Sequence, residues 1–268
     1  MNPIQPIDAD ARTQLTRREL LGFAAKGAAS VVVSQALLAR GDAVSSQQIT
    51  MPADSTIITD PTTVACVQTA ALTEGPFFVD EKLNRSDIRS DPATGVVSAG
   101  ALLNLKFNVM RVSSGACTPL TGAYLDVWHC DSAGTYSDVS GAGNGAGGAG
   151  RKFLRGYQVT DANGVAQFTT VYPGWYRGRA VHVHFKLRLF AGSSATYEFT
   201  SQFFFDEALT DAVHAQSPYN SKGRRNVVNI SDGIYNSLSA EEKSALTLRT
   251  SPAGSAYTGE ITLGVRVG

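Results

Sequence analysis

Period-two alternation of side chains marks five stretches of the chain from about residue 102 onward. The alternating positions are 103, 105, 107 and 109; 123, 125 and 127; 165, 167, 169 and 171; every second residue from 181 to 189; and every second residue from 261 to 267. A strand with one face against a core has this period. Turn sequences such as the Asp-Ala-Asn-Gly run at 161–164 separate the stretches. The pattern predicts an all-β fold, an antiparallel β-sandwich.

Two short helices are expected at the periphery of this sandwich. One covers about residues 207–216 and ends before Pro218. The other begins at Ser239, where Ser239 and Glu242 have the spacing of a capping box. The run from 141 to 150 is nearly all Gly and Ala, which indicates a surface loop.

The N-terminus has the features of a twin-arginine export signal. Residues 16–21 contain paired arginines and precede an apolar run of small residues from 22 to 38, interrupted by Lys26. The alternative is an amphipathic N-terminal helix. The run is shorter than the roughly 20 apolar residues of a stable membrane span. We expect a signal peptide at 1–43, a linker at 44–63 and one β domain at 64–268, exported to the periplasm or secreted.

Charge and cysteine content narrow the function classes. Lys plus Arg and Asp plus Glu both number 23, and the basic residues are scattered, so the sequence gives no sign of nucleic-acid binding. The chain has three cysteines, Cys66, Cys117 and Cys130. In an oxidising compartment this number favours one disulfide and one free thiol, and Cys66 with Cys117 is the preferred pair, although the sequence does not fix it. A cysteine-based zinc site is not expected, because no Cys-x-x-Cys pair occurs.

A histidine pair provides the strongest signal for chemistry. His182 and His184 lie two residues apart in a predicted strand, so both imidazoles project from the same face while Val183 projects from the other. Two imidazoles in this arrangement can share a metal ion. The alternative is a polar strand face, which Lys186 and Arg188 would continue. Only four histidines occur in the chain, which favours the metal site.

A tyrosine near this strand supplies a third ligand of unusual type. The sequence Tyr-Pro-Gly-Trp-Tyr-Arg at 172–177 predicts a turn that brings Tyr176 to the start of the histidine strand. A phenol has a pKa of about 10 and is a poor ligand, but a trivalent cation favours its ionised form. Phenolate oxygen combined with imidazole nitrogen suits Fe(III) better than zinc or copper.

Three motifs in this order resemble the intradiol ring-cleavage dioxygenases, the family of catechol 1,2-dioxygenase and protocatechuate 3,4-dioxygenase. The first is Asp-Val-Trp-His-Cys-Asp-Ser-Ala-Gly-Thr-Tyr-Ser at 126–137, the second is Pro-Gly-Trp-Tyr at 173–176, and the third is Arg-Ala-Val-His-Val-His at 179–184. Weaker similarity extends over about residues 69–206. The resemblance implies a β-sandwich catalytic domain.

The resemblance also implies a site and a reaction. Ferric iron would be held by Tyr136, Tyr176, His182 and His184 together with a hydroxide. A catechol-type substrate would bind through both oxygens as an Fe(III)-catecholate, and its protons would go to the hydroxide and to Tyr176. The matching position of Arg179 implies that it stabilises negative charge on the substrate ring, with Gln202 close to this arginine. Both atoms of O2 would enter the product, a muconate-type diacid.

Other features leave the substrate and two rival functions open. The connection from Tyr176 to His182 is shorter than in the well-known family members, so the choice among catechols is not fixed. One rival is a non-catalytic transthyretin-like or carbohydrate-binding sandwich. Another is a zinc or copper hydrolase that uses His182 and His184. The expected partners are a small aromatic diol and O2. A homodimer is compatible with the sequence, which does not fix the oligomeric state.

Side chains outside this set have structural interpretations. Trp128 and the aromatic run at 203–205 are expected in the core, His129 in a structural role and His214 at the surface.

Overall fold

The computed structural model describes residues 67–114, 116–141, 144 and 147–267. The predicted signal peptide and linker, at 1–43 and 44–63, lie outside the described residues, as does Cys66. No helix in the described part is long and apolar enough to cross a membrane.

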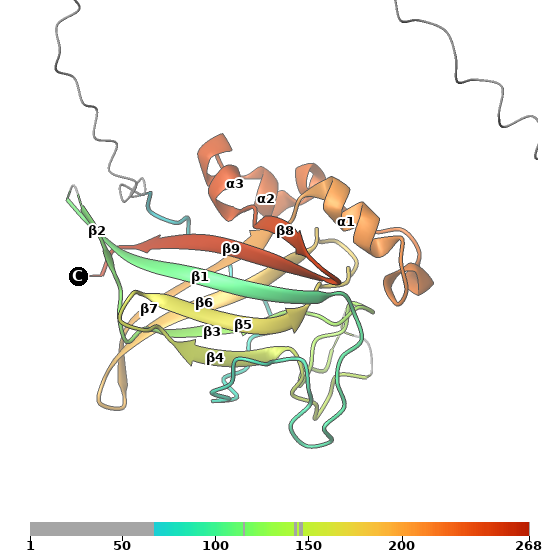
Figure 1. Ribbon diagram of the computed structural model, residues 1–268, viewed down its shortest axis with the longest axis horizontal. Helices are drawn as coiled ribbons and strands as arrows, with labels where there is room; N and C mark the ends of the chain where they lie inside the picture. Colours follow the sequence, from blue (N-terminus) through green and yellow to red (C-terminus); the bar gives the residue numbers. More distant parts are fainter. Residues whose placement is uncertain (1–66, 115, 142–143, 145–146, 268) are drawn as a thin grey trace, which may run out of the picture. The chain divides into compact units, whose positions relative to one another are not determined.

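Strands dominate the described part of the chain, as the alternation predicted (Figure 1). The strands are β1 Leu102–Ser113, β2 Ala116–Pro119, β3 Tyr124–Trp128, β4 Arg155–Val159, β5 Val165–Val171, β6 His182–Ala191, β7 Ser194–Phe204, β8 Arg249–Ala253 and β9 Ala256–Val265. The α-helices are α1 Glu207–His214, α2 Gly233–Asn236 and α3 Ala240–Leu246, and the 3-10 helices are η2 Tyr219–Lys222 and η3 Asn229–Ser231. The all-β prediction with short peripheral helices is confirmed.

The strands form two sheets. The larger has the order β2-β1-β9-β8, and β5 also pairs with β1. β5 pairs with residues 102–108 of β1 and β2 with residues 110–113, so these two strands follow one another along one edge of β1 while β9 occupies the other. The smaller sheet has the order β4-β3-β6-β7. The pairs between named strands are antiparallel except for β1 and β9, which run parallel side by side (Figure 1).

A cluster of aromatic rings joins the two sheets. The ring of Phe107 on β1 lies 5.9 Å from that of Phe168 on β5, 6.1 Å from that of Phe185 on β6 and 5.9 Å from that of Phe203 on β7. The cluster thus contains side chains from both sheets, and all four are buried. Large apolar areas removed from water in this way stabilise the sandwich.

The predicted inner face of one strand is wrong. In β5 the alternation was assigned to residues 165, 167, 169 and 171, but the buried side chains are Ala166, Phe168, Thr170 and Val171. Because strand side chains alternate between faces, an assignment shifted by one residue exchanges inside and outside. The helix predictions are closer, since the capping box of Ser239 and Glu242 is present and α1 begins after Asp206.

The smaller sheet is covered on both faces. One face of this sheet packs in the core. The N-terminal segment 69–81 lies against the other face and binds it through ion pairs. Lys186 on β6 pairs with Glu74 and lies 4.2 Å from the ring centre of Phe78. Arg188 binds Asp80 at 2.9 Å and Asp126 at 2.8 Å. Both basic residues are buried, so this face is an enclosed layer of paired charges that continues toward His184 and His182.

Replacing Phe107 by alanine should lower the free energy of unfolding by about 3–5 kcal/mol, because the change leaves a cavity where three other rings meet. Chemical denaturation of the two proteins measures this difference. Phe190→Ala is a matched control, because Phe190 is only partly buried near the end of β6 and should cost less than half as much. A loss below about 1 kcal/mol for Phe107→Ala would contradict this description of the core.

Candidate metal centre

The two histidines on β6 are buried side by side. His182 is 2% exposed and His184 1% exposed, and their Nε2 atoms lie 3.0 Å apart. β3 and β7 pair with β6 on either side, so the backbone carrying both imidazoles is fixed. The ring of Trp128 on β3 stacks on His184 with ring centres 4.9 Å apart and planes at 8°. The shared strand face predicted for the two imidazoles is present.

Hydrogen bonding fixes the tautomer of one of these rings. The Nδ1–H of His182 donates to the carbonyl of Ala180 at 2.7 Å, because a carbonyl oxygen can only accept. Its Nε2 atom therefore carries a lone pair directed at His184. The Nδ1 atom of His184 is buried without a hydrogen-bond partner among the described residues.

Both predicted tyrosines reach the same point. The hydroxyl oxygen of Tyr176 lies 3.1 Å from His182 Nε2, and that of Tyr136 lies 3.4 Å from the same atom. Tyr136 is buried, whereas Tyr176 is only partly buried. Two phenol oxygens and two imidazole nitrogens, from three separate parts of the chain, thus surround one position, and Tyr176 borders its more open side.

Asn144 and Phe77 hold Tyr136 in place. The Asn144 side chain accepts from the Tyr136 amide at 2.6 Å and donates to the Tyr136 carbonyl at 2.8 Å. Phe77 stacks on the Tyr136 ring with centres 4.5 Å apart. A Cβ atom on Gly148 would lie 1.9 Å from the Tyr136 carbonyl oxygen, so the close approach requires glycine there. The composition of 141–150 predicts only a surface loop, and the buried Asn144 was missed.

The turn that carries Tyr176 is tied to the loop before Tyr136. Gly174 donates its amide to the Asp131 carbonyl at 3.1 Å. Lys222 Nζ donates to the carbonyl of Ala133 and, at 2.6 Å, to that of Trp175. His214 Nε2 lies 3.0 Å from the Pro173 carbonyl. His214 is thus partly buried against this turn, and its assignment to the surface was wrong.

Burial governs the protonation of the four groups. Desolvation raises the pKa of Tyr176 to about 12 and that of Tyr136 well above its ordinary value. Desolvation likewise lowers the pKa of His182 to about 3 and that of His184 well below its ordinary value. Without a cation, all four side chains are therefore neutral at pH 7. A multivalent cation among them reverses this balance for the phenols, because its charge favours phenolate.

The donor set fits a hard transition-metal ion. Two nitrogens bound to one ion at about 2.0–2.1 Å and at right angles would lie about 3 Å apart, which is the separation of the two Nε2 atoms. In the described ranges no third His, Cys, Asp or Glu side chain joins His182 and His184 in a metal-binding group. The oxygens that do approach belong to Tyr136 and Tyr176, which favours Fe(III).

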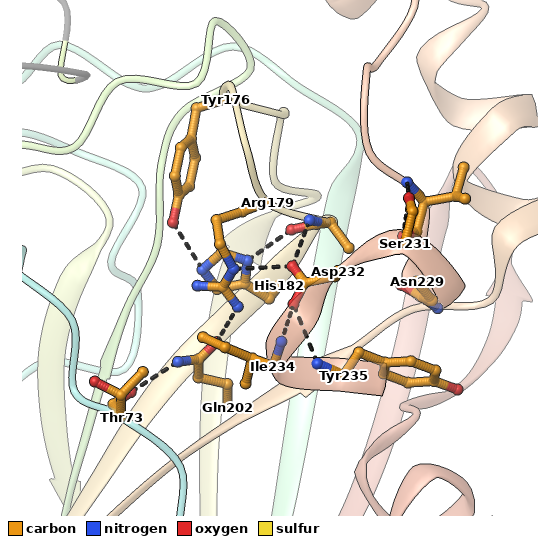
Figure 2. Close-up of polar contacts among 12 residues, drawn as sticks. Thr73, Tyr176, Arg179, His182, Gln202, Asn229, Ser231, Asp232, Ile234 and Tyr235 are labelled. Carbon is orange, nitrogen blue, oxygen red and sulfur yellow. Dashed lines mark hydrogen bonds and ion pairs between the residues drawn. The ribbon is translucent and has the colours of Figure 1, made fainter. Parts of the chain in front are cut away.

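Beside Tyr176 and His182 lies an arginine held from two sides (Figure 2). Arg179 donates from Nη2 to Gln202 at 2.6 Å and from Nε to Asp232 at 2.8 Å. The predicted proximity of Arg179 and Gln202 is thus present. Asp232 was missed, although Asp-Gly at 232–233 is a helix-start signal, and its side chain caps α2.

The remaining predictions concern structural residues. Trp128 and the aromatic run at 203–205 are buried, as expected. His129 is also buried and bonds to Cys130 O at 2.8 Å and Thr170 Oγ1 at 2.7 Å, in agreement with a structural role. Cys117 is disulfide-bonded and Cys130 is a buried free thiol. The pairing of Cys117 with Cys66 stays a prediction.

We predict that the metal-free protein loses stability as the pH falls from about 6.5 toward 4. Burial lowers the pKa of His129 to about 4 and that of His182 to about 3, so between these values and about 6.5 the unfolded chain binds protons that the folded chain does not. Stability therefore rises with pH across this window. Burial raises the pKa of Asp126 to about 6 and also raises the pKa values of Asp131 and Glu81, so these three carboxyl groups act in the opposite direction, but His184 adds to the histidine effect.

Urea unfolding midpoints at several pH values between 4.5 and 7.5 measure this dependence. His129→Gln removes one titrating group and should flatten the slope. A midpoint that does not change across the window would contradict the description of these imidazoles as buried and neutral.

Comparison with known proteins shows to which family this chain belongs. A family model described as Dioxygenase matches residues 73–234, which include all the predicted site residues. The intradiol ring-cleavage dioxygenase from Tetranychus urticae is 29% identical, with a TM-score of 0.63, over 75% of this chain and 95% of that one.

A second solved structure is the dioxygenase domain of a dioxygenase carbohydrate-binding protein fusion from Streptomyces sp. SirexAA-E. It is 24% identical with a TM-score of 0.50 over 75% of this chain and 100% of that domain, and it supports the fold alone. No curated protein matches the chain. Because the family match spans more than half of the sequence and contains the converging tyrosines and histidines, the chain belongs to the intradiol ring-cleavage dioxygenases.

Proposed function

We propose that this protein is an iron(III)-dependent dioxygenase that cleaves a catechol-type aromatic ring between its two hydroxyl groups and yields a muconate-type diacid. Tyr136, Tyr176, His182 and His184 are the proposed ligands. The observation that carries the proposal is the approach of both phenol oxygens, at 3.4 and 3.1 Å, to the same imidazole nitrogen that lies 3.0 Å from its neighbour.

Ferric iron held by these four residues would supply a Lewis acid that makes the ring carbons of the diol more reactive toward O2. The protein contributes two phenol oxygens that, when ionised, offset two of the three positive charges. It also contributes two neutral imidazoles, since burial lowers the pKa of His182 to about 3 and that of His184 well below its ordinary value.

The two tyrosines are suited to different roles. Tyr136 is 1% exposed and anchored through Asn144, so it is a permanent ligand in this proposal. Tyr176 is partly exposed and lies on a turn. In the absence of a bound cation the environment of Tyr176 favours the phenol, because burial raises its pKa to about 12. Tyr176 can therefore take a proton from the incoming diol at its hydroxyl oxygen.

Arg179 supplies positive charge at the more open side of the site. Its Nε and Nη2 atoms are bound by Asp232 and Gln202, while its side chain is 18% exposed. A guanidinium held in advance of the reaction stabilises negative charge that develops on the substrate ring at little cost in reorganisation. Gln202 does not need to touch the substrate for this effect, because its amide holds the arginine.

The proposed substrate class is a small aromatic diol encountered outside the cytoplasm, which rests on the export signal predicted at 1–43. The short connection from Tyr176 to His182, only residues 177–181, leaves little chain to form a pocket wall. Catechols with different ring substituents are thus reasonable substrates. Among the rivals, a zinc or copper hydrolase would leave the two converging phenols without a role, and a carbohydrate-binding sandwich would leave all four groups without one.

The iron-loaded protein should be coloured, because phenolate bound to Fe(III) gives a charge-transfer band in the visible region. Tyr136→Phe and Tyr176→Phe should each shift or weaken this band. Tyr124→Phe, at a partly buried tyrosine that contacts Tyr157 and Phe190, should leave it unchanged. Visible absorption and metal analysis of the exported protein measure the outcome. A colourless protein with stoichiometric zinc would instead favour the hydrolase.

Turnover should consume one O2 for each diol and form a muconate-type diacid, since both oxygen atoms enter the product. Catechol, hydroxyquinol and protocatechuate are the first substrates to compare, with oxygen uptake and product identification by mass. A semialdehyde product would show cleavage outside the diol and would overturn the proposed reaction.

A further inference from the structure

Asp232 is a buried carboxylate with four hydrogen-bond donors. Its side chain is 0% exposed. One oxygen, Oδ2, accepts from Arg179 Nε at 2.8 Å and from the Ala180 amide at 2.7 Å. The other, Oδ1, accepts from the amides of Ile234 at 2.8 Å and Tyr235 at 3.1 Å. Figure 2 shows the carboxylate between Arg179 and the start of α2.

The charge of this carboxylate is maintained inside the protein. Burial by itself raises the pKa of Asp232, but the Ala180 amide and the positive charge of Arg179 outweigh it, and the net pKa lies below its ordinary value. Asp232 is therefore ionised at neutral pH. A buried carboxylate with an arginine and three amides makes stronger hydrogen bonds than neutral partners would.

The guanidinium of Arg179 is fixed between two anchored groups. On one side is Asp232, whose own position is set by the first turn of α2. On the other side is Gln202, which accepts from Arg179 Nη2 at 2.6 Å and donates to the Thr73 carbonyl at 2.7 Å. Two of the three guanidinium nitrogens thus bind the protein, which leaves Nη1 as the nitrogen without a hydrogen bond in the described part of the chain.

The same carboxylate is also connected to the histidine strand through one residue, Ala180. The Ala180 amide donates to Asp232, and the Ala180 carbonyl accepts from His182 Nδ1 at 2.7 Å. Arg179 and Ala180 are adjacent, so one side chain holds both the arginine head group and the backbone that orients His182. Its contacts distinguish Asp232 from a simple helix cap.

We propose that Asp232 is a positioning residue that acts through Arg179, holding the guanidinium so that its free Nη1 edge faces the bound aromatic diol. The inference rests on the proposed function, because it assigns Arg179 to the substrate side of the metal centre. Asp232 itself does not touch the substrate.

The requirement for two acceptor oxygens explains why an amide cannot replace this carboxylate. Each carboxylate oxygen of Asp232 accepts hydrogen bonds from two N–H donors. Asparagine has one acceptor oxygen and a donor NH2 group. In Asp232→Asn, either Arg179 and Ala180 or the first amides of α2 must therefore face an NH2 group. The variant weakens the hold on the arginine or the helix cap.

A double-mutant cycle tests the inference. We expect Asp232→Asn to lower kcat at least tenfold while the Kd for catechol, from titration of the visible band, changes less. In the Arg179→Gln background the same substitution should lower kcat by a much smaller factor, because the guanidinium through which Asp232 acts is gone and only its contact with the Ala180 amide remains. Asp206→Asn is the matched control. Asp206 caps α1 through Leu209 and makes no ion pair among the described residues.

A second measurement does not depend on iron or turnover. In the metal-free protein, the Arg179 Nε–H should give a slowly exchanging signal in a proton–nitrogen correlation spectrum, identified by its loss in Arg179→Gln. Asp232→Asn should abolish its protection and Asp206→Asn should not. If Asp232→Asn does not fold, Asp232→Ser replaces it, because serine still caps a helix but cannot bind the guanidinium as a carboxylate does.

The outcomes separate this inference from the proposed function. A wild-type protein that binds no iron and cleaves no catechol would overturn both. An active wild type in which Asp232→Asn loses the same factor in both backgrounds, or no more than Asp206→Asn, would overturn the positioning role alone. Unchanged protection of Arg179 Nε–H in Asp232→Asn would do so as well.

Discussion

The close approach of two buried imidazoles is the constraint on which the rest of this structure depends. His182 and His184 are two positions apart on β6, and the alternation of the strand directs both rings into the same small volume, with their Nε2 atoms 3.0 Å apart. β3 and β7 pair with β6 on both sides, so this distance is set by the sheet and not by a flexible loop. Tyr136 and Tyr176 need only bring their hydroxyl oxygens to the position that the two imidazoles define.

The surrounding protein has to offset the free-energy cost of burying these polar histidine and tyrosine side chains. Ionised groups in such a place are unfavourable, which is why the pKa values of the phenols are raised and those of the imidazoles are lowered. The N-terminal segment closes over the sheet through ion pairs to Lys186 and Arg188, and Phe77 packs on Tyr136. The result is a buried set of neutral donors, which in the proposed function hold a multivalent cation.

The fold was largely predictable because strand alternation is a local property. The stretches 103–109, 183–187 and 261–265 lie within strands and have the expected buried faces. The face of β5 was misassigned because Val165 and Val171 share a parity, while Ala166 and Phe168 occupy the core side. The parallel pairing of β1 with β9 joins residues about 150 positions apart, and no local pattern encodes such a contact.

In the candidate site, too, residues close together in the sequence were easier to predict than residues that folding brings together. The pair His182 and His184 could be derived from spacing, whereas Tyr136 came from family resemblance, since 46 residues separate it from His182. Asp232 and Asn144 were missed. Each makes its decisive contacts through folding of distant or irregular segments: Asp232 meets Arg179 across 53 residues, and Asn144 folds back on Tyr136 from within a glycine-rich loop.

The most direct test of the account is diffraction from crystals of the iron-loaded protein, with data collected at the iron absorption edge. We expect one anomalous peak, at a bonding distance of about 2 Å from the hydroxyl oxygens of Tyr136 and Tyr176 and from the Nε2 atoms of His182 and His184. An iron peak elsewhere, or one bound by the imidazoles while both phenols point away, would contradict it.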